Sequence, residues 1–311
     1  MAQLDIVGLG LSTLDVLIQL KDMPTWDNPG RIGDFGLDGG GPVGTACVAA
    51  ARLGARVGYV GIAGNDINAE LKLQSFRDAG VDLSHLLVRQ RPESHIVVVW
   101  VNEENGERAF SGLRRFASDP VLAEELDRDY ITSGQYLHLD GFDEAAAETA
   151  IGWMHAAGKK VCLDAAKTEG GAVNPRLAAL APLVDILICG SGFGCALTGH
   201  GDIWKAGEAM RAMGPSIVVQ TEGEDGSYTT AASESFHTPA FKVDVVDTTG
   251  AGDVFHGAYL AGLLHNWDLR TTALFATATS ALECTRLGGR CGIPSFDDVI
   301  SFLHQRGVSI T

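Results

Sequence analysis

The residues whose types and spacing could do chemistry are Asp-Thr-Thr-Gly-Ala-Gly-Asp, at positions 247–253. The run from Val254 onward is rich in apolar and small residues, which predicts a buried helix that starts near Gly252. The first turn of such a helix has unpaired backbone N–H groups, and the glycines let an anion approach them closely. The Asp253 carboxylate would repel that anion, so its presence here indicates a separate role. A suitable role is that of a general base, which accepts the proton of a hydroxyl as this attacks a phosphoryl group. The alternative for a lone acid here is a favourable contact with the helix dipole.

The elements that must position this loop alternate along the chain. An apolar strand pattern at residues 4–10 precedes a small-residue helical pattern at 44–55 and a second strand pattern at 56–64. The same order, helix then Val/Ile-rich strand, recurs at 143–166 and 203–221. This alternation predicts the α/β class, with a doubly wound, mostly parallel sheet flanked by helices.

Two stretches interrupt the alternation. Residues 16–41 are punctuated by Pro and Gly, and residues 93–112 read as two strands joined by a hairpin at Glu-Glu-Asn-Gly. Such strands need a small sheet of their own. We expect a β lid of residues 12–43 and 90–118, inserted into a core of residues 1–11, 44–89 and 119–311.

The composition restricts the partners. The chain has 23 basic and 39 acidic residues and a net charge of -16, which argues against nucleic acid or an anionic membrane as the main partner. No uncharged apolar run reaches the roughly 18 residues of a membrane span. The six cysteines form no CxxC pair and none of the nine histidines completes a zinc spacing, so we expect free thiols and a cytoplasmic protein.

Two other nucleotide-binding classes match the sequence poorly. The glycines after the first strand, Gly-Leu-Gly-Leu-Ser-Thr, lack the third glycine of the dinucleotide-binding motif. The chain also contains no GxxxxGK[ST] sequence, which excludes a P-loop kinase.

The run DTTGAGDVFHGAYLAGLL resembles the C-terminal signature of the ribokinase-like, or PfkB, carbohydrate kinases. The run GGGPVGTACVAAARLGARVGYVGIAGND, from Gly39, is similar to the earlier signature of that family, and TEGEDGSYT and CTRLGGRCGIPSFDDV extend the similarity over nearly the whole chain. The resemblance implies an α/β core with a small β lid, and an enzyme that uses ATP and Mg²⁺. It implies that Asp253 is the catalytic base and that the backbone of Gly250, Ala251 and Gly252 forms an anion hole.

The resemblance also implies a sugar site at the other signature. Asp15 matches a carboxylate that binds sugar hydroxyls, although a strand-end turn acid is the alternative from sequence alone. Gly40 and Gly41 match the glycines against which the sugar lies. Asp140 stands where some relatives hold a substrate-binding acid, and it could equally cap the end of a strand.

The nucleotide and cation sites are implied in the same way. Thr221, Gly223 and Gly226 resemble the nucleotide-binding turn of the family. Asp247 and Thr249 resemble its monovalent-cation site, where K⁺ would order the anion hole. The sequence leaves open whether this protein needs that ion.

Four positions depart from the family pattern. Gly44 replaces the usual asparagine of the first signature, so one sugar hydrogen bond is missing or supplied elsewhere. Gly190 and Phe193 replace the Asn and Glu of an NxxE motif that helps to organise Mg²⁺, which leaves the metal to nucleotide phosphates and water. His256 stands where relatives often have Asn or Cys, and we expect it to pack on its helix. These departures keep a second hypothesis open, a sugar-binding sensor that has lost phosphoryl transfer.

The substrate is the least defined part of the prediction. The catalytic half most resembles the sulfofructose kinases, which phosphorylate a sugar that carries a sulfonate. Arg108, Arg114 and Arg115 in the expected lid could bind such an anionic group, and the alternative is an ordinary solvated hairpin. A neutral ketose, ribose or a nucleoside therefore remains open. Unpaired edges of the lid sheet would also favour a homodimer.

Overall fold

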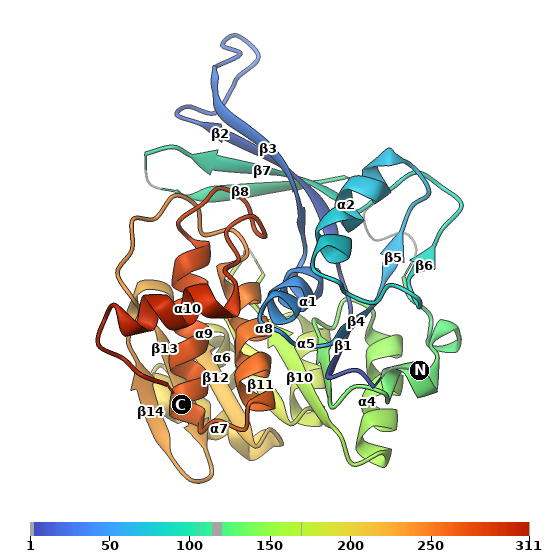
Figure 1. Ribbon diagram of the computed structural model, residues 1–311, viewed down its shortest axis with the longest axis vertical. Coiled ribbons are helices and arrows are strands. Elements are labelled where there is room, and N and C mark those ends of the chain that lie inside the picture. The colour runs from blue at the N-terminus through green and yellow to red at the C-terminus, as the bar shows by residue number, and fades with distance from the viewer. Residues whose placement is uncertain (1–2, 105, 114–119, 169, 311) are drawn as a thin grey trace.

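The computed structural model describes residues 3–104, 106–113, 120–168 and 170–310. Its centre is an eight-stranded sheet in which six neighbouring strands run parallel and two antiparallel strands form one edge. The expected doubly wound, mostly parallel sheet is therefore confirmed (Figure 1). In spatial order, the strands are β14 (Ser235–Thr238), β13 (Ser227–Ala231), β12 (Ile217–Thr221), β11 (Ile186–Cys189), β10 (Lys160–Ala165), β9 (Tyr136–Leu139), β1 (Ile6–Leu9) and β4 (Val57–Val60).

Helices cover both faces of this sheet, and each face has its own hydrophobic core. The central strands β1, β9 and β11 are buried at every position, as near-continuous apolar strands of a parallel sheet should be. One face packs against α1 (Pro42–Arg52), α2 (Ile67–Asp78), α8 (Ala251–Leu264), α9 (Leu269–Glu283) and α10 (Phe296–His304). The other packs against α3 (Arg128–Ile131), α4 (Glu144–Ala156), α5 (Pro175–Leu180), α6 (Phe193–Thr198) and α7 (Ile203–Met213).

A second sheet of four strands stands above the large one in Figure 1. Its order is β3 (Ile32–Gly40), β2 (Thr13–Leu20), β7 (Ile96–Asn102) and β8 (Arg108–Gly112). The pairs β2–β3 and β7–β8 are antiparallel, as the expected hairpin requires, and β2 pairs with β7 in parallel. Helix α1 starts at Pro42, two residues before the core boundary that we expected at residue 44. A further short pair, β5 (Ile62–Ala63) and β6 (Leu87–Val88), was not expected.

The small sheet is held to the core by a buried ion pair at its base. The Lys72 ammonium of α2 lies 2.5 Å from the Glu93 carboxylate, and both side chains are almost inaccessible to solvent. The Glu93 carboxylate also accepts the backbone N–H groups of Gly64, Ser94 and His95. This ion pair therefore fixes the segment that leads into β7.

Two further observations bear on expectations from the sequence. All six cysteines are free, as expected. Within the described residues, no helix has the length and apolar character needed to cross a membrane.

Candidate active site

A cavity of about 1320 Å³ opens where the carboxyl ends of the large-sheet strands face the small sheet. Residues that follow β1, β10, β11 and β12 form its floor, and β2, β3, β7 and β8 contribute its other wall. Most of the predicted site residues line it: Asp15, Gly40, Gly41, Arg108, Thr221, Gly223, Gly226, Thr249, Gly250, Ala251, Gly252 and Asp253. The cavity is large enough to hold a nucleotide and a small second substrate together.

The start of helix α8 presents backbone N–H groups to this cavity. Gly250 caps the helix in a left-handed conformation, with φ of 79°, and a Cβ there would lie 2.7 Å from the Gly289 carbonyl oxygen. No side chain caps α8, whereas Asp66, Asp202 and Asp268 cap other helices. The Ala251 N–H donates to the Thr248 carbonyl at 3.3 Å. The next two N–H groups, of Gly252 and Asp253, donate to no other described residue and remain available for a ligand.

The Asp253 side chain projects from the first turn of α8 into the cavity. Its carboxylate accepts no hydrogen bond from the residues that the structure describes, so it is free to take a proton. Burial raises the pKa of Asp253 to about 7, and the carboxylates of Asp15 and Asp140 add to the rise. The guanidinium groups of Arg108 and Arg290 partly oppose it. A carboxyl group with this pKa suits a general base near neutral pH.

The wall opposite α8 contains Asp15 and two glycines. Asp15 is only 5% exposed, and its carboxylate accepts a hydrogen bond of 2.6 Å from the Thr13 hydroxyl. Burial raises the pKa of Asp15 to about 6 despite that hydrogen bond. A Cβ on Gly40 would collide with the Asp15 carboxylate, and Gly41 has a left-handed φ of 85°. Both positions therefore need glycine, and backbone is what they present to a ligand.

Asp140 lies outside the cavity lining, although it follows strand β9 directly. Its two carboxylate oxygens accept the backbone N–H groups of Leu11 and Phe142, at 2.8 and 2.9 Å. The structure thus places Asp140 as a cap between two strand ends, the alternative that the sequence left open.

A buried arginine that we did not predict supports the side of the cavity formed by Gly40 and Gly41, which we call the glycine wall. Arg290 is 1% exposed, although it comes from the loop after α9. Its guanidinium group donates to the Gly40 carbonyl at 2.6 Å and to the hydroxyls of Thr45 and Ser75, and its carbon Cζ lies 4.5 Å from the centre of the Phe76 ring. The backbone N–H of Arg290 donates to Asp38. The sequence shows this residue only as part of Leu-Gly-Gly-Arg, a turn signal without a visible partner.

Arg290 also explains why Gly44 replaces the usual asparagine. A Cβ on Gly44 would lie well inside van der Waals contact of the Arg290 guanidinium and 2.7 Å from the Ser12 Cβ. The space for a longer side chain at position 44 is thus taken by Arg290. No asparagine can donate to a sugar from this position without displacing that arginine.

The other end of the cavity is formed by the turn between β12 and β13. Thr221, Gly223 and Gly226 line it, and both glycines have positive φ. Glu222 points toward the loop after β11, where its carboxylate accepts the Gly192 N–H at 3.1 Å and the Ser191 hydroxyl. A carboxylate from the turn after β12 therefore reaches Ser191 and Gly192, which lie between the two NxxE positions, 190 and 193. The sequence contains Glu222 within TEGEDG but gives no sign of this contact.

Gly190 and Phe193 differ in their surroundings. Gly190 lines the cavity, whereas Phe193, the first residue of α6, is fully buried in the core. Phe193 therefore contacts neither a nucleotide nor a metal ion.

Of the three lid arginines, the structure describes one. Arg108 lines the cavity and donates a short hydrogen bond to the Thr248 hydroxyl, which joins β8 to the loop before α8. Arg114 and Arg115 lie outside the described residues.

Asp247 and Thr249 lie directly before Gly250, and both are buried. The Asp247 carboxylate accepts the Thr249 N–H and hydroxyl and the Gly288 N–H. Glu283 lies close enough for the Asp247 charge to raise its pKa further, after burial as the main cause. Both Glu283 oxygens are buried without a hydrogen-bond partner among the described residues. Orphaned carboxylate oxygens beside Asp247 are what a monovalent cation would satisfy.

Comparisons with known proteins identify the family of the chain. The family model "pfkB family carbohydrate kinase" matches residues 6–295. An ATP-dependent ribose-1-phosphate kinase of Halopiger xanaduensis is 27% identical, over 97% of this chain and 98% of its own. A 5-dehydro-2-deoxygluconokinase of Shouchella clausii is 26% identical, over 98% and 97%.

Solved structures agree on the fold. An E. coli protein solved in complex with ATP and Mg²⁺ superposes with a TM-score of 0.84 at 22% identity, over 97% of this chain and 99% of its own. The family model covers nearly the whole chain, including the loop that carries Asp253. The chain therefore belongs to the PfkB family of carbohydrate kinases and is a sugar kinase with the ribokinase-like fold.

Proposed function

We propose that this kinase transfers the γ-phosphoryl group of ATP to a hydroxyl of a sugar or sugar derivative, with Asp253 as the general base. The observation that carries the proposal is the shared cavity. The unpaired N–H groups at the start of α8 and the Asp253 carboxylate lie in it, with Asp15 and the glycine wall on one side. The turn of residues 221–226 lies at its other end.

The chemistry follows from these positions. Asp253 takes the proton of the attacking hydroxyl, whose oxygen then bonds to the γ-phosphorus while the bond to ADP breaks. The N–H groups at the start of α8, with Gly250, Ala251 and Gly252 as the anion hole, stabilise the charge on the transferred group. Asp15 and the backbone of Gly40 and Gly41 hold the sugar.

We further propose Mg²⁺ as the partner of the ATP phosphates and K⁺ as the ion beside Asp247, Thr249 and Glu283. With Gly190 and Phe193 in the NxxE positions, Mg²⁺ would be held by phosphates and water. Free cysteines and the use of ATP favour the cytoplasm as the location.

For the substrate we propose an anionic ketose, such as sulfofructose. Arg108 supports this choice because its guanidinium group lines the cavity and carries a fixed positive charge. Ribose or a nucleoside is the second candidate, and a catalytically weakened sensor is the third. The sensor is disfavoured by the unpartnered carboxylate of Asp253, since sugar binding alone has no use for a base.

The first test is ADP release from Mg²⁺·ATP across ketoses, sulfofructose, sugar phosphates, sugar acids, ribose and nucleosides, with and without K⁺. Turnover restricted to anionic sugars supports the reading of Arg108, and turnover on a neutral sugar or a nucleoside refutes it. Binding of a sugar without turnover anywhere in the panel would favour the sensor.

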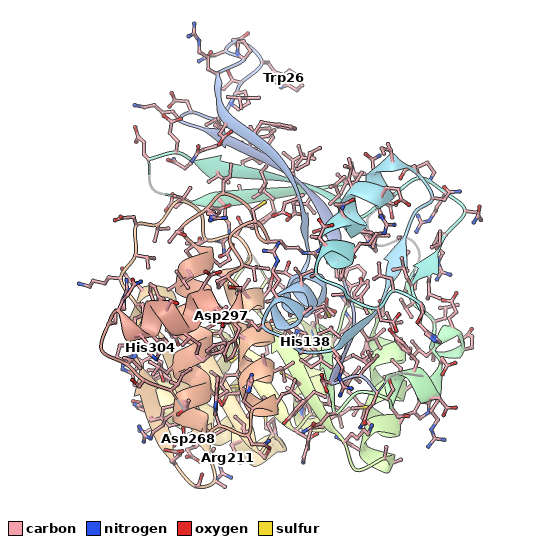
Figure 2. All side chains as sticks on the ribbon, in the orientation of Figure 1. Trp26, His138, Arg211, Asp268, Asp297 and His304 are labelled. Atoms are coloured by element: carbon pink, nitrogen blue, oxygen red, sulfur yellow. The ribbon has the colours of Figure 1, made fainter. Side chains whose placement is uncertain are left out.

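The second test replaces the base. Asp253→Asn should abolish turnover and keep sugar binding, measured by calorimetry. The matched control is Asp297→Asn, an exposed residue of α10 (Figure 2) that does not line the cavity and should behave as the unmodified enzyme. Near-normal turnover by Asp253→Asn would refute the assignment of the base.

We also propose a homodimer through the small sheet. Strand β3 is an edge strand, and it exposes 60% of Ile32, 56% of Phe35 and 46% of Leu37. Trp26, at the tip of the β2–β3 hairpin, is fully exposed (Figure 2). Apolar side chains on an unpaired edge favour association with a second copy. Sedimentation should give the dimer mass, and Phe35→Glu should give the monomer; a monomer mass for the unmodified chain would refute the proposal.

A further inference from the structure

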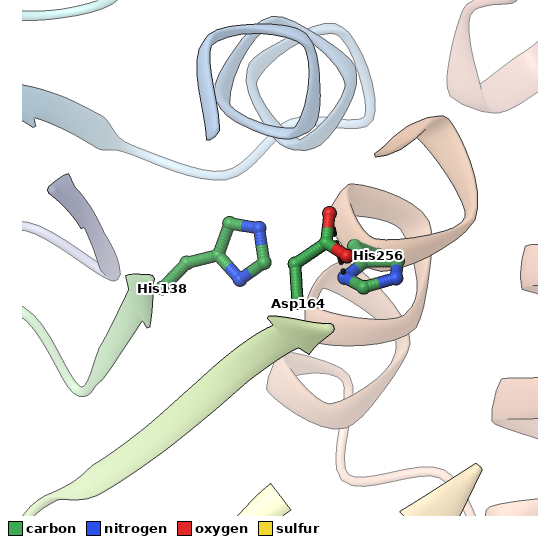
Figure 3. Close-up of side chains that lie close together, drawn as sticks. All are labelled: His138, Asp164 and His256. Carbon is green, nitrogen blue, oxygen red and sulfur yellow. Dashed lines mark ion pairs between the residues drawn. The ribbon is translucent and has the colours of Figure 1, made fainter. Parts of the chain in front are cut away.

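Two buried histidines and an aspartate meet beneath the start of α8. His138 lies on β9, Asp164 on the neighbouring β10 and His256 one turn after Asp253 on α8 (Figure 3). One donor atom from each residue can be chosen so that all three lie within 4.8 Å of one another. The Nδ1 atom of His256 is 3.7 Å from an Asp164 oxygen, which is too long for a hydrogen bond.

The histidines are unusual because their ring nitrogens lack partners. His138 and His256 are 1% and 2% exposed. Neither ring nitrogen of His138, and not the Nδ1 atom of His256, makes a hydrogen bond to any described residue. Buried polar atoms without a partner are costly and call for an explanation.

A ligand bound between the three residues would explain these unpartnered atoms. A neutral imidazole has one ring nitrogen with a lone pair, and that nitrogen can bind a metal ion.

We propose that His138, Asp164 and His256 form a binding site for a divalent transition-metal ion, with Zn²⁺ as the best match. Two imidazole nitrogens and one carboxylate oxygen are a donor set that Zn²⁺ and related ions accept. Bonds of about 2.1 Å at the tetrahedral angle place two donors on one ion about 3.4 Å apart. The donor atoms lie within 4.8 Å of one another, so the widest pair closes by as much as about 1.4 Å when the ion binds.

The positions of the three residues give the metal ion a path from the cavity and a structural role. Asp164 and His256 line the active-site cavity, whereas His138 is buried behind them, so the ion enters from the cavity and keeps one coordination position open. The bound ion links α8 to strands β9 and β10 of the large sheet. It thereby fixes the helix whose first turn carries Asp253 and the anion-binding N–H groups.

A metal-free arrangement is the competing explanation. Burial, with the nearby charges of Asp253 and Asp140, raises the pKa of Asp164 well above its usual value. A protonated Asp164 could donate to His256 after a small movement, and the three groups would then form a neutral buried cluster. That arrangement leaves His138 without a partner and binds no ion.

The test uses the full chain, stripped of metals and without nucleotide. Zn²⁺ titration by calorimetry should show one tight site, and saturating Zn²⁺ should raise Tm by several degrees. Co²⁺ bound at the same site should give a visible absorption spectrum that differs from that of aqueous Co²⁺. Absence of a stoichiometric site in the unmodified chain would overturn the proposal without reference to any variant.

The variants separate this site from surface histidines. His256→Asn and His138→Gln should each weaken Zn²⁺ binding by at least about 100-fold and remove the Co²⁺ spectrum. His304→Gln, an exposed histidine on α10 (Figure 2), is the control and should bind as the unmodified chain does. Undiminished binding by both cluster variants, or a loss confined to His304→Gln, would also overturn the proposal.

Discussion

Substitution of Gly44 by alanine tests whether Arg290 determines what position 44 can hold. Gly44 lies inside α1, where alanine is normally preferred over glycine. The added Cβ would occupy the space of the Arg290 guanidinium group, so that group must move. Its freedom is small because four partners hold it: the Gly40 carbonyl, the hydroxyls of Thr45 and Ser75, and the face of the Phe76 ring.

Two opposing effects determine how much Gly44→Ala changes the free energy of unfolding. Alanine in place of glycine within a helix stabilises by about 1 kcal/mol. Displacement of the guanidinium group breaks one or two hydrogen bonds to a charged donor, each contributing about 1.5–3 kcal/mol. The net expectation for Gly44→Ala is a loss of about 0.5–5 kcal/mol in the free energy of unfolding, the opposite sign from an ordinary helical glycine.

Urea denaturation of a double-mutant cycle measures this coupling. Arg290→Met removes the guanidinium group and retains most of the stem, so Gly44→Ala should cost less in that background, where the close contact with the Ser12 Cβ remains. The expected coupling is about 2–3 kcal/mol, near the upper end for side chains in contact. The control is Gly152→Ala in α4, where a Cβ meets nothing within 4 Å, and which should stabilise by about 0.5–1 kcal/mol.

Two results would refute the reasoning about Arg290. One is a Gly44→Ala protein as stabilised as Gly152→Ala. The other is additivity of Gly44→Ala and Arg290→Met, since independent sites add and competing ones do not.

Three further predictions concern buried charges. A general base acts in its deprotonated form, and the pKa of Asp253 is about 7, so kcat/KM should fall about tenfold per pH unit below pH 7. A flat profile of kcat/KM from pH 5 to 8 would contradict the assignment of Asp253 as the base. The same raised pKa means that the protonated Asp253 carboxyl stabilises the folded state, and that this contribution is lost as pH rises through 7. At pH 8, Asp253→Asn should therefore be inactive but should unfold at a higher urea concentration than the unmodified enzyme. Glu93→Gln should lower the free energy of unfolding by about 3–5 kcal/mol because it leaves the Lys72 ammonium buried and unpaired. Glu104→Gln, which breaks the exposed pair with Lys21, should cost less than about 1 kcal/mol, and equal losses would contradict the argument.

Features that depend on neighbouring residues could be predicted from the sequence. The alternation of helical and apolar strand patterns gave the α/β class, and the glycines before Asp253 indicated the helix start that the structure contains. The antiparallel pairing of β7 with β8 was predicted in the same way, because the two strands are adjacent in the chain. Local propensity suffices wherever the partners of a residue lie within one turn or one hairpin.

Features that depend on distant partners could not be predicted. The departure at Gly44 makes sense only with Arg290, and the pairing of Glu222 with Ser191 joins two strands. His138 and His256 approach Asp164 from separate segments, and His256 looked like an ordinary packed residue of its helix. No periodicity in one chain segment reports which other segment will lie beside it.

Arg290 has a consequence for the making of the protein on the ribosome. Its guanidinium group binds the Gly40 carbonyl, and the two residues are 250 positions apart in the chain. At about 5–20 residues per second, roughly 12–50 s separate the synthesis of the acceptor from that of the donor. Throughout this interval Gly40 lacks the buried cation that binds its carbonyl, so this wall of the cavity is completed only after residue 290 has been made.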